Sequence, residues 1–369
     1  MKLLTVIGAR PQIIKAAAVS RAIHDHFADQ VTETILHTGQ HYDANMSAQF
    51  FGELNIPQPA YNLGIGSMPT DLQTDLIIKG IVNNLNKHRY DGVIVYGDTT
   101  STLAGALAAS QCGVPLFHIE AGLRSFNNTM PEEHNRVVAD QHAAICFAPT
   151  RTAVDNLRRE GLERHTVLSG DIMLDNTLHY SALAAQRCDI LRRLSLKNNG
   201  YILATLHRNY NTDDGTRLTT LLLTLLALAN EYHTRVIMPL HPRTRMMMQR
   251  WLPEFTYHYL LRSRRLMLIR PVGYLDMLEL ERNAQVVMTD SGGVQKEAFF
   301  LERPCVILRP ETEWVEIVEH GAGLLADADT DRIKSAYDTL STRTVHFPPL
   351  FGDGHAAETI IKEIINYLK

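Results

Sequence analysis

The feature that most constrains the fold is a regular alternation between short, continuously apolar segments and longer helix-forming ones in the first half of the chain. Strands that are apolar along their whole length are typical of parallel sheets covered by helices on both faces. We therefore expect a parallel α/β domain here. The expected strands are residues 3–9, 32–39, 92–98, 114–120 and 143–149, and the expected helices are residues 15–27, 76–88 and 102–111.

The same alternation starts again after a changeover region at about residues 151–198. A length of 369 residues suits two domains. We therefore expect two similar α/β domains with a cleft between them, in which ligands bind beyond the carboxyl ends of the strands. The expected second set comprises strands at residues 201–207, 235–241, 265–271, 285–291 and 304–310, and a long helix through residues 216–232.

Composition and charge exclude several classes of protein. The 36 Lys and Arg residues against 40 Asp and Glu residues give a net charge of −4, so there is no global basic field for nucleic acid or an anionic membrane. The basic run at residues 262–265 is expected to be a solvated loop. The opening MKLLTVIG is cut short by Arg10-Pro11, and the apolar run 220–229 is too short to cross a bilayer. The sequence predicts no membrane segment.

The four cysteines lie far apart and have no metal-binding spacing. Reduced thiols in a cytoplasmic protein are the expectation for such a pattern. A metal site built from His207, His241 and Asp98 is conceivable, but no motif spacing supports it.

Polar residues gather where the expected strands end. One polar strand end means little, but a series of seven favours a functional cleft over solvated turns. His118 and Glu120 are two residues apart in one expected strand, and we expect His118 to be the structural member of this pair. The polar strand ends are Gly8–Gln12 with Lys15 soon after, Thr38–His41, Gly97–Thr100, His118–Gly122, His207–Arg208, His241–Pro242 and Thr289–Gly293.

The stretch TDSGGVQKE at residues 289–297 joins an apolar strand to a helix. It fits two readings equally well when taken alone. In the first, Asp290 or Ser291 caps the helix and the glycines turn the chain. In the second, the glycines let an anion approach the helix N-terminus.

Other residues favour the second reading. Arg10 and Lys15 bring positive charge to the same cleft, as a diphosphate requires. Glu297 can accept both hydroxyls of a ribose. Because neither a Walker motif nor GxGxxG is present, a nucleotide sugar fits better than NAD or ATP.

Carboxylates dominate the first half of the predicted cleft. The carboxylates are Asp98, Glu120 and the pair Glu132–Glu133. When carboxylates are crowded in a closed cleft, one pKa rises, so that one group can act as an acid and another as a base near neutral pH. For Glu132–Glu133 a helix N-terminus that favours negative charge is at least as good an explanation. His207, from the second half, is a candidate to exchange a proton.

Taken together, nine motifs resemble the non-hydrolysing UDP-N-acetylglucosamine 2-epimerase family. The resemblance covers essentially the whole chain, and the combination is highly specific. The motifs, in order, are GARPQIIK, TGQHYDANM, GDTTSTLAGALAA, HIEAGLRS, MPEEHNR, TLHRN, PLHPRT, TDSGGVQKEA and FGDGHAAE.

The resemblance implies an α/β protein with the GT-B fold, that is, two Rossmann-like domains whose parallel sheets face each other across a deep cleft. The implied domains are residues 1–170, the UDP-binding residues 171–353, and a final helix at 354–369 that packs back on the first domain. It also implies a cytoplasmic homodimeric isomerase without cofactor or metal, which interconverts UDP-GlcNAc and UDP-ManNAc for surface polysaccharide synthesis. In the implied reaction, anti elimination of UDP gives 2-acetamidoglucal, and UDP then adds back.

The resemblance also assigns residues. The catalytic positions of the family are matched by Asp98, Glu120, Glu132 and His207. Three of these, Asp98, Glu120 and His207, are also matched to substrate contacts. The implied UDP- and substrate-binding set is Arg10, Lys15, Asp98, Glu120, His207, His241, Val272, Met277, Ser291, Gly292, Gly293, Glu297 and Trp314. Gln40, His41, Arg208 and His241 match parts of an activating UDP-GlcNAc site, but an arginine of that site is missing around Met68–Asp71.

Three positions depart from the family pattern. Trp314 replaces an arginine in TEWVE, and Val272 and Met277 replace the usual glutamine and phenylalanine near the uracil. The TEWVE form resembles members that act on modified sugars such as UDP-2,3-diacetamido-2,3-dideoxy-glucuronate. The alternatives are therefore an epimerase of such a sugar, a GT-B glycosyltransferase with a UDP-sugar donor, a hydrolysing epimerase and a nucleotide-sugar sensor.

Overall fold

The computed structural model of the chain describes residues 1–40, 51–52, 54–66, 68–127 and 129–369. The chain divides into two compact units. Unit 1 comprises Met1–Asn176 and Pro349–Lys369, and unit 2 comprises Thr177–Pro348. The division falls inside helix α7 (Ile172–Arg187). No described helix is both long and apolar enough to cross a membrane.

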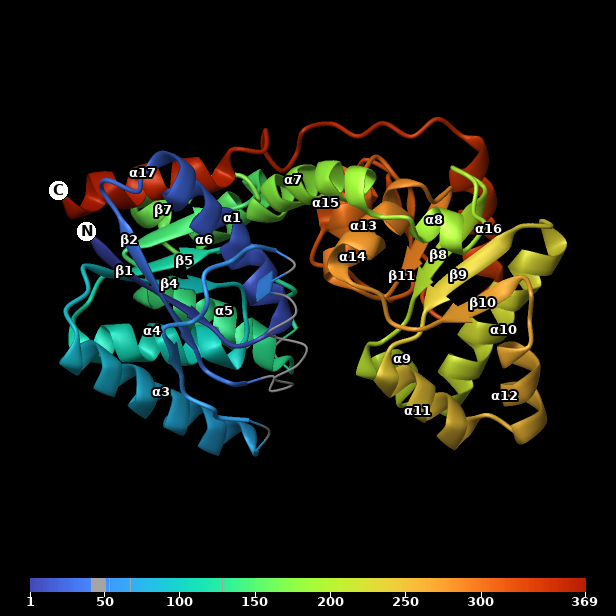
Figure 1. Cartoon of the computed structure of the whole chain (residues 1–369), viewed down its shortest axis with the longest axis horizontal. Helices are drawn as coiled ribbons and strands as arrows, with labels where there is room; N and C mark the ends of the chain where they lie inside the picture. Colours follow the sequence, from blue (N-terminus) through green and yellow to red (C-terminus); the bar gives the residue numbers. More distant parts are fainter. Residues whose placement is uncertain (41–50, 53, 67, 128) are drawn as a thin grey trace. The chain divides into compact units, whose positions relative to one another are not determined.

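Unit 1 is built on a parallel sheet in the order β3-β2-β1-β4-β5-β6-β7. Helices α1 and α17 lie together on one face, and α3 and α4 cover the other (Figure 1). The strands are β1 Lys2–Ile7, β2 Thr32–His37, β3 Tyr61–Asn62, β4 Gly92–Tyr96, β5 Leu116–Ile119, β6 Ile145–Ala148 and β7 Thr166–Leu168. The helices are α1 Arg10–His26, α3 Thr70–Lys87, α4 Thr100–Cys112, α5 Pro131–His142, α6 Arg151–Arg159 and α17 Ala356–Leu368.

Unit 2 repeats this architecture with a parallel sheet in the order β10-β9-β8-β11-β12-β13. Its strands are β8 Tyr201–Thr205, β9 Arg235–Pro239, β10 Leu266–Ile269, β11 Val286–Thr289, β12 Cys305–Ile307 and β13 Gly323–Leu325. Its helices are α8 Ile190–Arg193, α9 Asn209–Thr212, α10 Gly215–Glu231, α11 Pro242–Trp251, α12 Glu254–Leu261, α13 Tyr274–Arg282, α14 Gly292–Phe300, α15 Val315–Glu319 and α16 Thr330–Thr342.

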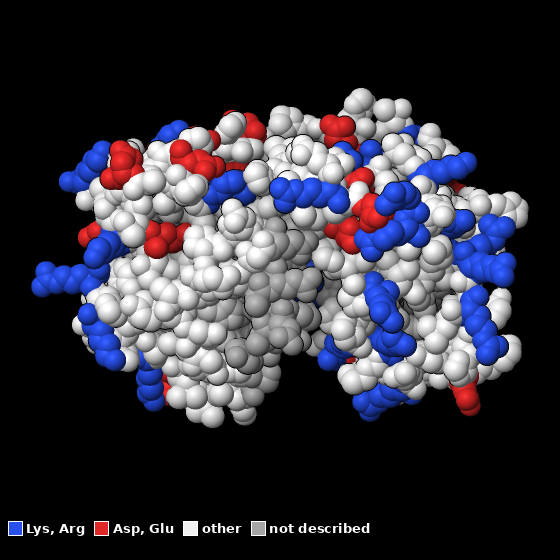
Figure 2. Space-filling view, in the orientation of Figure 1, with Lys and Arg blue, Asp and Glu red and all other residues white. Residues whose placement is uncertain are grey.

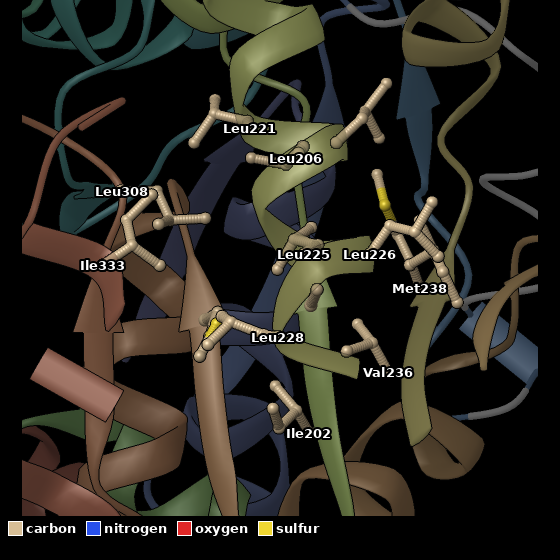
Figure 3. Packing of buried hydrophobic residues seen from close by; sticks show 14 of the residues in the cluster. Ile202, Leu206, Leu221, Leu225, Leu226, Leu228, Val236, Met238, Leu308 and Ile333 are labelled. Carbon is tan, nitrogen blue, oxygen red and sulfur yellow. The ribbon is translucent and has the colours of Figure 1, made fainter. Parts of the chain in front are cut away.

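Helix α10 supplies much of the core of unit 2 (Figure 3). Its residues Leu221, Leu225 and Leu228 recur at helical spacing and pack with Ile202 of β8 and Val236 of β9. All five are 1% exposed or less. Burying one such side chain contributes about 1.5–3 kcal/mol, so the sheet is held firmly against α10.

Both sheets reverse their strand order at one place. In unit 1, β2 and β3 lie on one side of the adjacent pair β1 and β4, and β5, β6 and β7 lie on the other side. In unit 2, β9 and β10 lie on one side of the pair β8 and β11, and β12 and β13 lie on the other. At such a point the helices that follow two neighbouring strands diverge to opposite faces, which leaves a crevice beyond the strand ends. The residues that follow these four strands are Gly8, Gly97, Leu206 and Asp290. Four of the seven predicted polar strand ends, those after β1, β4, β8 and β11, therefore lie at the topological switch points.

Candidate active site

The loop from β1 to α1 is fixed by Gln12, a residue to which the sequence interpretation gave no role. Its side-chain oxygen accepts the N–H groups of Gly8 and Ala9 at 2.8 and 3.2 Å. Its amide nitrogen donates to the Tyr96 carbonyl at the end of β4, at 3.0 Å. A Cβ on Gly8 would lie 2.0 Å from Ser101 Oγ, so only glycine fits there. The hydrogen bonds of Gln12 therefore fix the backbone that forms the floor of the unit 1 switch point.

Lys15 and Glu120 form an ion pair beside this floor. Their side chains are 12% and 10% exposed. Glu120 has φ 68°, in the left-handed region that non-glycine residues seldom adopt. Such strain is most often kept at functional positions. Arg10, by contrast, stands exposed at the first position of α1.

Asp98 follows β4 and is held by helix α5. Arg136 Nη2 donates to the Asp98 carboxylate at 2.5 Å, and Asn135 Nδ2 donates to the Asp98 carbonyl at 2.8 Å. The arginine side chain is 6% exposed and the aspartate side chain 30%. The carboxylate therefore has a fixed orientation and remains open to solvent.

The two neighbouring glutamates of α5 have different surroundings. Glu133 is buried and accepts the N–H groups of Ser125 and Phe126 at 2.9 and 3.0 Å, and it pairs with Arg136 at 2.9 Å. Burial favours its neutral form, but these bonds outweigh burial and hold the pKa of Glu133 below its ordinary value. Glu132 is only half-buried in the first turn. Glu133 is thus structural, and Glu132 is the member available for chemistry.

His118 is fully buried, which agrees with the structural role expected for it. It lies 2.6 Å from Asp140 and 2.8 Å from the Gly97 carbonyl. Burial disfavours the charge on Asp140, but His118 and Arg124 outweigh it and hold the pKa of Asp140 below its ordinary value. This buried network positions the turn that carries Asp98.

Of the residues matched to an activating site, Gln40 accepts hydrogen bonds from the Ser101 N–H and hydroxyl at 3.1 and 2.7 Å, so it ties β2 to α4. His41 lies outside the described residues. Arg208 and His241 are exposed at the starts of α9 and α11 in unit 2.

In unit 2 the segment from β11 to α14 has a feature of each reading of TDSGG, namely a capping side chain and an accessible glycine. Ser291 caps α14 by accepting the N–H of Val294 at 3.4 Å. A Cβ on Gly292 would lie 2.3 Å from Glu313 Oε1, so a larger residue there would displace the Glu313 carboxylate. A Cβ on Gly293 would meet nothing closer than 3.8 Å. The helix N-terminus is thus capped on one side and open at Gly293.

Asp290 does not cap α14. It accepts the N–H groups of His207 and Arg208 at 3.1 and 3.0 Å, and the Asn211 amide at 3.1 Å. Its carboxylate also lies 3.4 Å from His207 Nδ1. The motif alone indicates a cap for Asp290, because a partner 83 positions away in the sequence cannot be read from it. Asp290 positions His207, whose ring centroid is 5.8 Å from that of His241.

The remaining predicted residues of unit 2 lie around α14. Glu297 is 6% exposed, and Val272 and Met277 pack partly buried against the core beneath β8 and β11. Trp314 is 2% exposed, and its Nε1 lies 3.3 Å from the position of a Cβ on Gly292. The Lys296 ammonium stands over the indole, 4.1 Å from its centroid. Trp314 therefore helps to shape the N-terminus of α14.

A family model described as UDP-N-acetylglucosamine 2-epimerase matches residues 24–365 of the chain. A Pseudomonas aeruginosa protein named UDP-2,3-diacetamido-2,3-dideoxy-D-glucuronate 2-epimerase is 46% identical, and the match covers 98% of both chains. A UDP-N-acetylglucosamine 2-epimerase of Methanocaldococcus jannaschii is 39% identical, with 100% of both chains covered.

Solved structures agree with these relatives. The Methanocaldococcus jannaschii UDP-GlcNAc 2-epimerase in complex with UDP-GlcNAc and UDP superposes with a TM-score of 0.90 at 38% identity, over 100% of both chains. The Neisseria meningitidis enzyme bound to UDP-GlcNAc gives a TM-score of 0.88 at 30% identity, over 99% of this chain and 100% of that one. Together with the two parallel sheets, these matches confirm the predicted GT-B fold. The chain belongs to the UDP-N-acetylglucosamine 2-epimerase family.

Proposed function

We propose that the protein inverts the configuration at C2 of a UDP-linked 2-acetamido sugar without releasing free sugar. The observation that carries this proposal is the set of three carboxylates, Asp98, Glu120 and Glu132, which follow β4, follow β5 and open α5 in a chain of this family. Asp98 is oriented by Arg136 and Glu120 by Lys15. Proton transfer on two faces of one carbon needs more than one such group.

The hydrogen on C2 is not acidic, because no carbonyl adjoins that carbon within the ring. A carboxylate takes the C2 proton while the C1–O bond breaks and its electron pair leaves with UDP, which gives 2-acetamidoglucal. UDP then adds back to C1 while a proton reaches C2 from the opposite face. Atoms and charge balance over the two steps, so no cofactor is consumed. His207, held by Asp290, is the candidate proton carrier in unit 2.

We propose that UDP is held by the N-terminus of α14. Ser291, Gly292 and Gly293 stand at that N-terminus, where unpaired N–H groups and the helix dipole favour phosphate. Glu297, one turn into the helix, is placed to accept the ribose hydroxyls, and Arg10 and Lys15 supply positive charge for the diphosphate. Val272 and Met277 are the proposed neighbours of the uracil, and His241 is a further proposed UDP- or substrate-binding residue.

For the sugar, we favour UDP-2,3-diacetamido-2,3-dideoxy-glucuronate over UDP-GlcNAc. Two observations support this choice. The relative that bears this substrate in its name is 46% identical, against 44% for a relative named as a UDP-N-acetylglucosamine 2-epimerase homolog and 39% for one named as a UDP-N-acetylglucosamine 2-epimerase. In addition, Trp314 puts an indole beside Gly292 where the family pattern has an arginine, and Lys296 is buried against it.

The cellular setting is also a proposal. Free cysteines at all four positions suit a reducing compartment, so we propose a cytoplasmic enzyme. The family resemblance supports a homodimer that supplies precursors for surface polysaccharide. Gln40, His41 and Arg208 are proposed remnants of an activating site.

The decisive experiment is proton NMR of the purified protein with each UDP-sugar in D2O. We expect new signals of the C2 epimer carrying deuterium at C2, with the diacetamido uronate turned over faster than UDP-GlcNAc. Free sugar together with UDP would assign a hydrolysing reaction instead. No change with either substrate would contradict the proposed function and point to the glycosyltransferase reading.

A further inference from the structure

A second surface of unit 2 is unlike the rest of the chain in charge. Residues 242–270, which span α11, α12 and β10, contain seven arginines and one glutamate, a local charge of +6 in a chain of net charge −4. Figure 2 shows blue side chains and little red where Figure 1 places α11 and α12. The whole-chain charge on which the sequence interpretation relied conceals this local excess.

Exposed apolar side chains occupy the same two helices. Phe255 is 82% exposed, Met246 and Tyr259 are each 53% exposed, and Trp251 is 40% exposed. A phenylalanine has no polar atom that would reward contact with water, and exposed apolar side chains that lie together are typical of interaction surfaces.

The arrangement of these side chains is regular. In α12, Phe255, His258 and Tyr259 recur at i, i+3 and i+4, and Arg262 follows at i+7 just beyond the helix end, so they share one face. The rings of Phe255 and Tyr259 stack, with centroids 6.2 Å apart.

Helix α11 packs beside α12 and also carries exposed apolar and basic side chains. The Gln249 amide donates to the Tyr257 hydroxyl at 3.2 Å, which ties α11 to α12. The Arg250 guanidinium stands 4.6 Å from the centroid of the Trp251 ring. We define the α11–α12 face by six residues: Met246, Arg250, Trp251, Phe255, Tyr259 and Arg262. Among the described residues, neither Arg250 nor Arg262 pairs with a carboxylate.

We propose that the α11–α12 face binds the surface of an anionic lipid bilayer. Aromatic side chains partition to the level of the lipid headgroups, and arginines attract anionic headgroups and bind their phosphates. A second copy of the chain fits this face poorly, because a two-fold contact would bring its arginines against their own counterparts. A nucleic acid would use the arginines but would gain little from Met246. The proposal does not depend on which sugar the enzyme accepts.

The test is sedimentation of the full chain with vesicles of phosphatidylglycerol and phosphatidylcholine in equal parts, and with vesicles of phosphatidylcholine alone. We expect reversible binding to the anionic vesicles only, weakened by salt. Each arginine near the surface strengthens binding about fivefold, so Arg250→Gln with Arg262→Gln should lower the partition coefficient roughly 25-fold. Phe255→Ser with Tyr259→Ser should lower it on the order of tenfold.

Matched controls come from exposed residues elsewhere. Arg151→Gln with Arg159→Gln on α6 removes the same charge from unit 1, and Leu223→Ser removes an exposed apolar side chain from α10. All variants should keep C2 exchange in free solution, which shows that they fold. The proposal is wrong if the wild type ignores anionic vesicles, if it binds neutral vesicles equally well, or if both α11–α12 variants bind like the controls. Tighter binding to a single-stranded oligonucleotide, weakened by the arginine changes alone, would also overturn it.

Discussion

At the scale of single residues, Asp98 offers the most direct test of the catalytic assignment. Replacing Asp98 with Asn keeps the size of the side chain and a hydrogen-bond acceptor for Arg136, but it removes the ability to take a proton. We expect turnover to fall by about 10²–10⁴-fold, with UDP affinity within a few-fold of the wild type. NMR exchange and calorimetric titration measure the two quantities. Asp155→Asn, on the exposed side of α6, is the control, and normal turnover by Asp98→Asn would remove Asp98 from the mechanism.

The neighbours Glu132 and Glu133 form a matched pair for separating chemistry from structure. Glu133→Gln weakens bonds to the N–H groups of Ser125 and Phe126 and to Arg136, and we expect a loss of about 1–3 kcal/mol in unfolding free energy. Because the pKa of Glu133 is lowered in the folded state, this stabilisation is present above the unfolded pKa and is lost as the pH falls.

Glu132→Gln should behave in the opposite way, with stability within about 0.5 kcal/mol of the wild type and turnover strongly reduced. Chemical denaturation and the exchange assay on both variants provide the comparison. Equal losses of stability in the two variants would mean that both glutamates are structural.

Glu281 is a buried acid without an evident role in the proposed reaction. It is 0% exposed, and neither carboxyl oxygen has a hydrogen-bond partner among the described residues. Burial raises the pKa of Glu281 well above its ordinary value, and the nearby Glu297 raises it further. The folded state therefore binds a proton that the unfolded state releases, so Glu281 lowers stability progressively as the pH rises above 4.5.

We expect Glu281→Met to raise the unfolding free energy by about 1–3 kcal/mol at pH 8 and by less at pH 4.5. Denaturant titrations at the two pH values measure this. A stable variant that lost activity would show that the buried acid is retained for function, through Glu297. A gain that does not change with pH would contradict the assignment of a neutral carboxyl.

At the scale of secondary-structure elements, helix α17 is docked on unit 1 through Asp175. The carboxylate of Asp175 accepts the N–H groups of Ala356 and Ala357 at 3.2 and 2.8 Å, at the N-terminus of α17. Burial outweighs these bonds and raises the pKa of Asp175 to about 6. An acid whose pKa is raised on folding costs stability as the pH rises from the unfolded pKa to the folded one.

The wild type should therefore lose stability relative to Asp175→Asn between pH 4 and pH 6. At roughly 1.4 kcal/mol per pKa unit, the rise from 3.8 to about 6 corresponds to about 3 kcal/mol. Unfolding free energies of both proteins across this range provide the measurement. A constant difference between the two proteins would show that Asp175 does not titrate there.

The elements also show what a sequence reveals and what it conceals. Long, continuously apolar strands such as β1 and β4 were predicted within two or three residues of their ends, because burial on both faces leaves a strong signal. Strands β3, β7 and β13 were missed, since each has only two or three residues and lies at a sheet edge. Helix α1 begins at Arg10 rather than near Lys15, because Pro11 suits the first turn of a helix.

Within the site, the strand-end residues themselves could be found from sequence, but their partners could not. The ion pair of Glu120 with Lys15 spans 105 positions, and the positive φ of Glu120 has no sequence signal. Likewise, nothing in the order of Glu132 and Glu133 indicates which of them is buried. Such facts depend on tertiary contacts, which a single sequence does not encode locally.

At the scale of the whole molecule, the proposed UDP-binding residues are divided between the two units. Arg10 and Lys15 belong to unit 1, and Ser291 and Glu297 belong to unit 2. A ligand that binds only the folded state stabilises it by an amount that depends on its concentration, about 2.7 kcal/mol at a hundredfold excess over Kd. If both groups of residues bind one UDP molecule, the binding of UDP must stabilise both units.

Scanning calorimetry with and without UDP tests this. Each unit has its own core, so without UDP we expect two overlapping transitions, and with UDP we expect both to rise and approach one another. Arg10→Gln should weaken UDP binding while leaving both transitions of the free protein in place, because Arg10 is exposed on unit 1. A UDP-induced rise in only one transition would mean that a single unit holds the nucleotide, and the roles proposed for Arg10 and Lys15 would then be wrong.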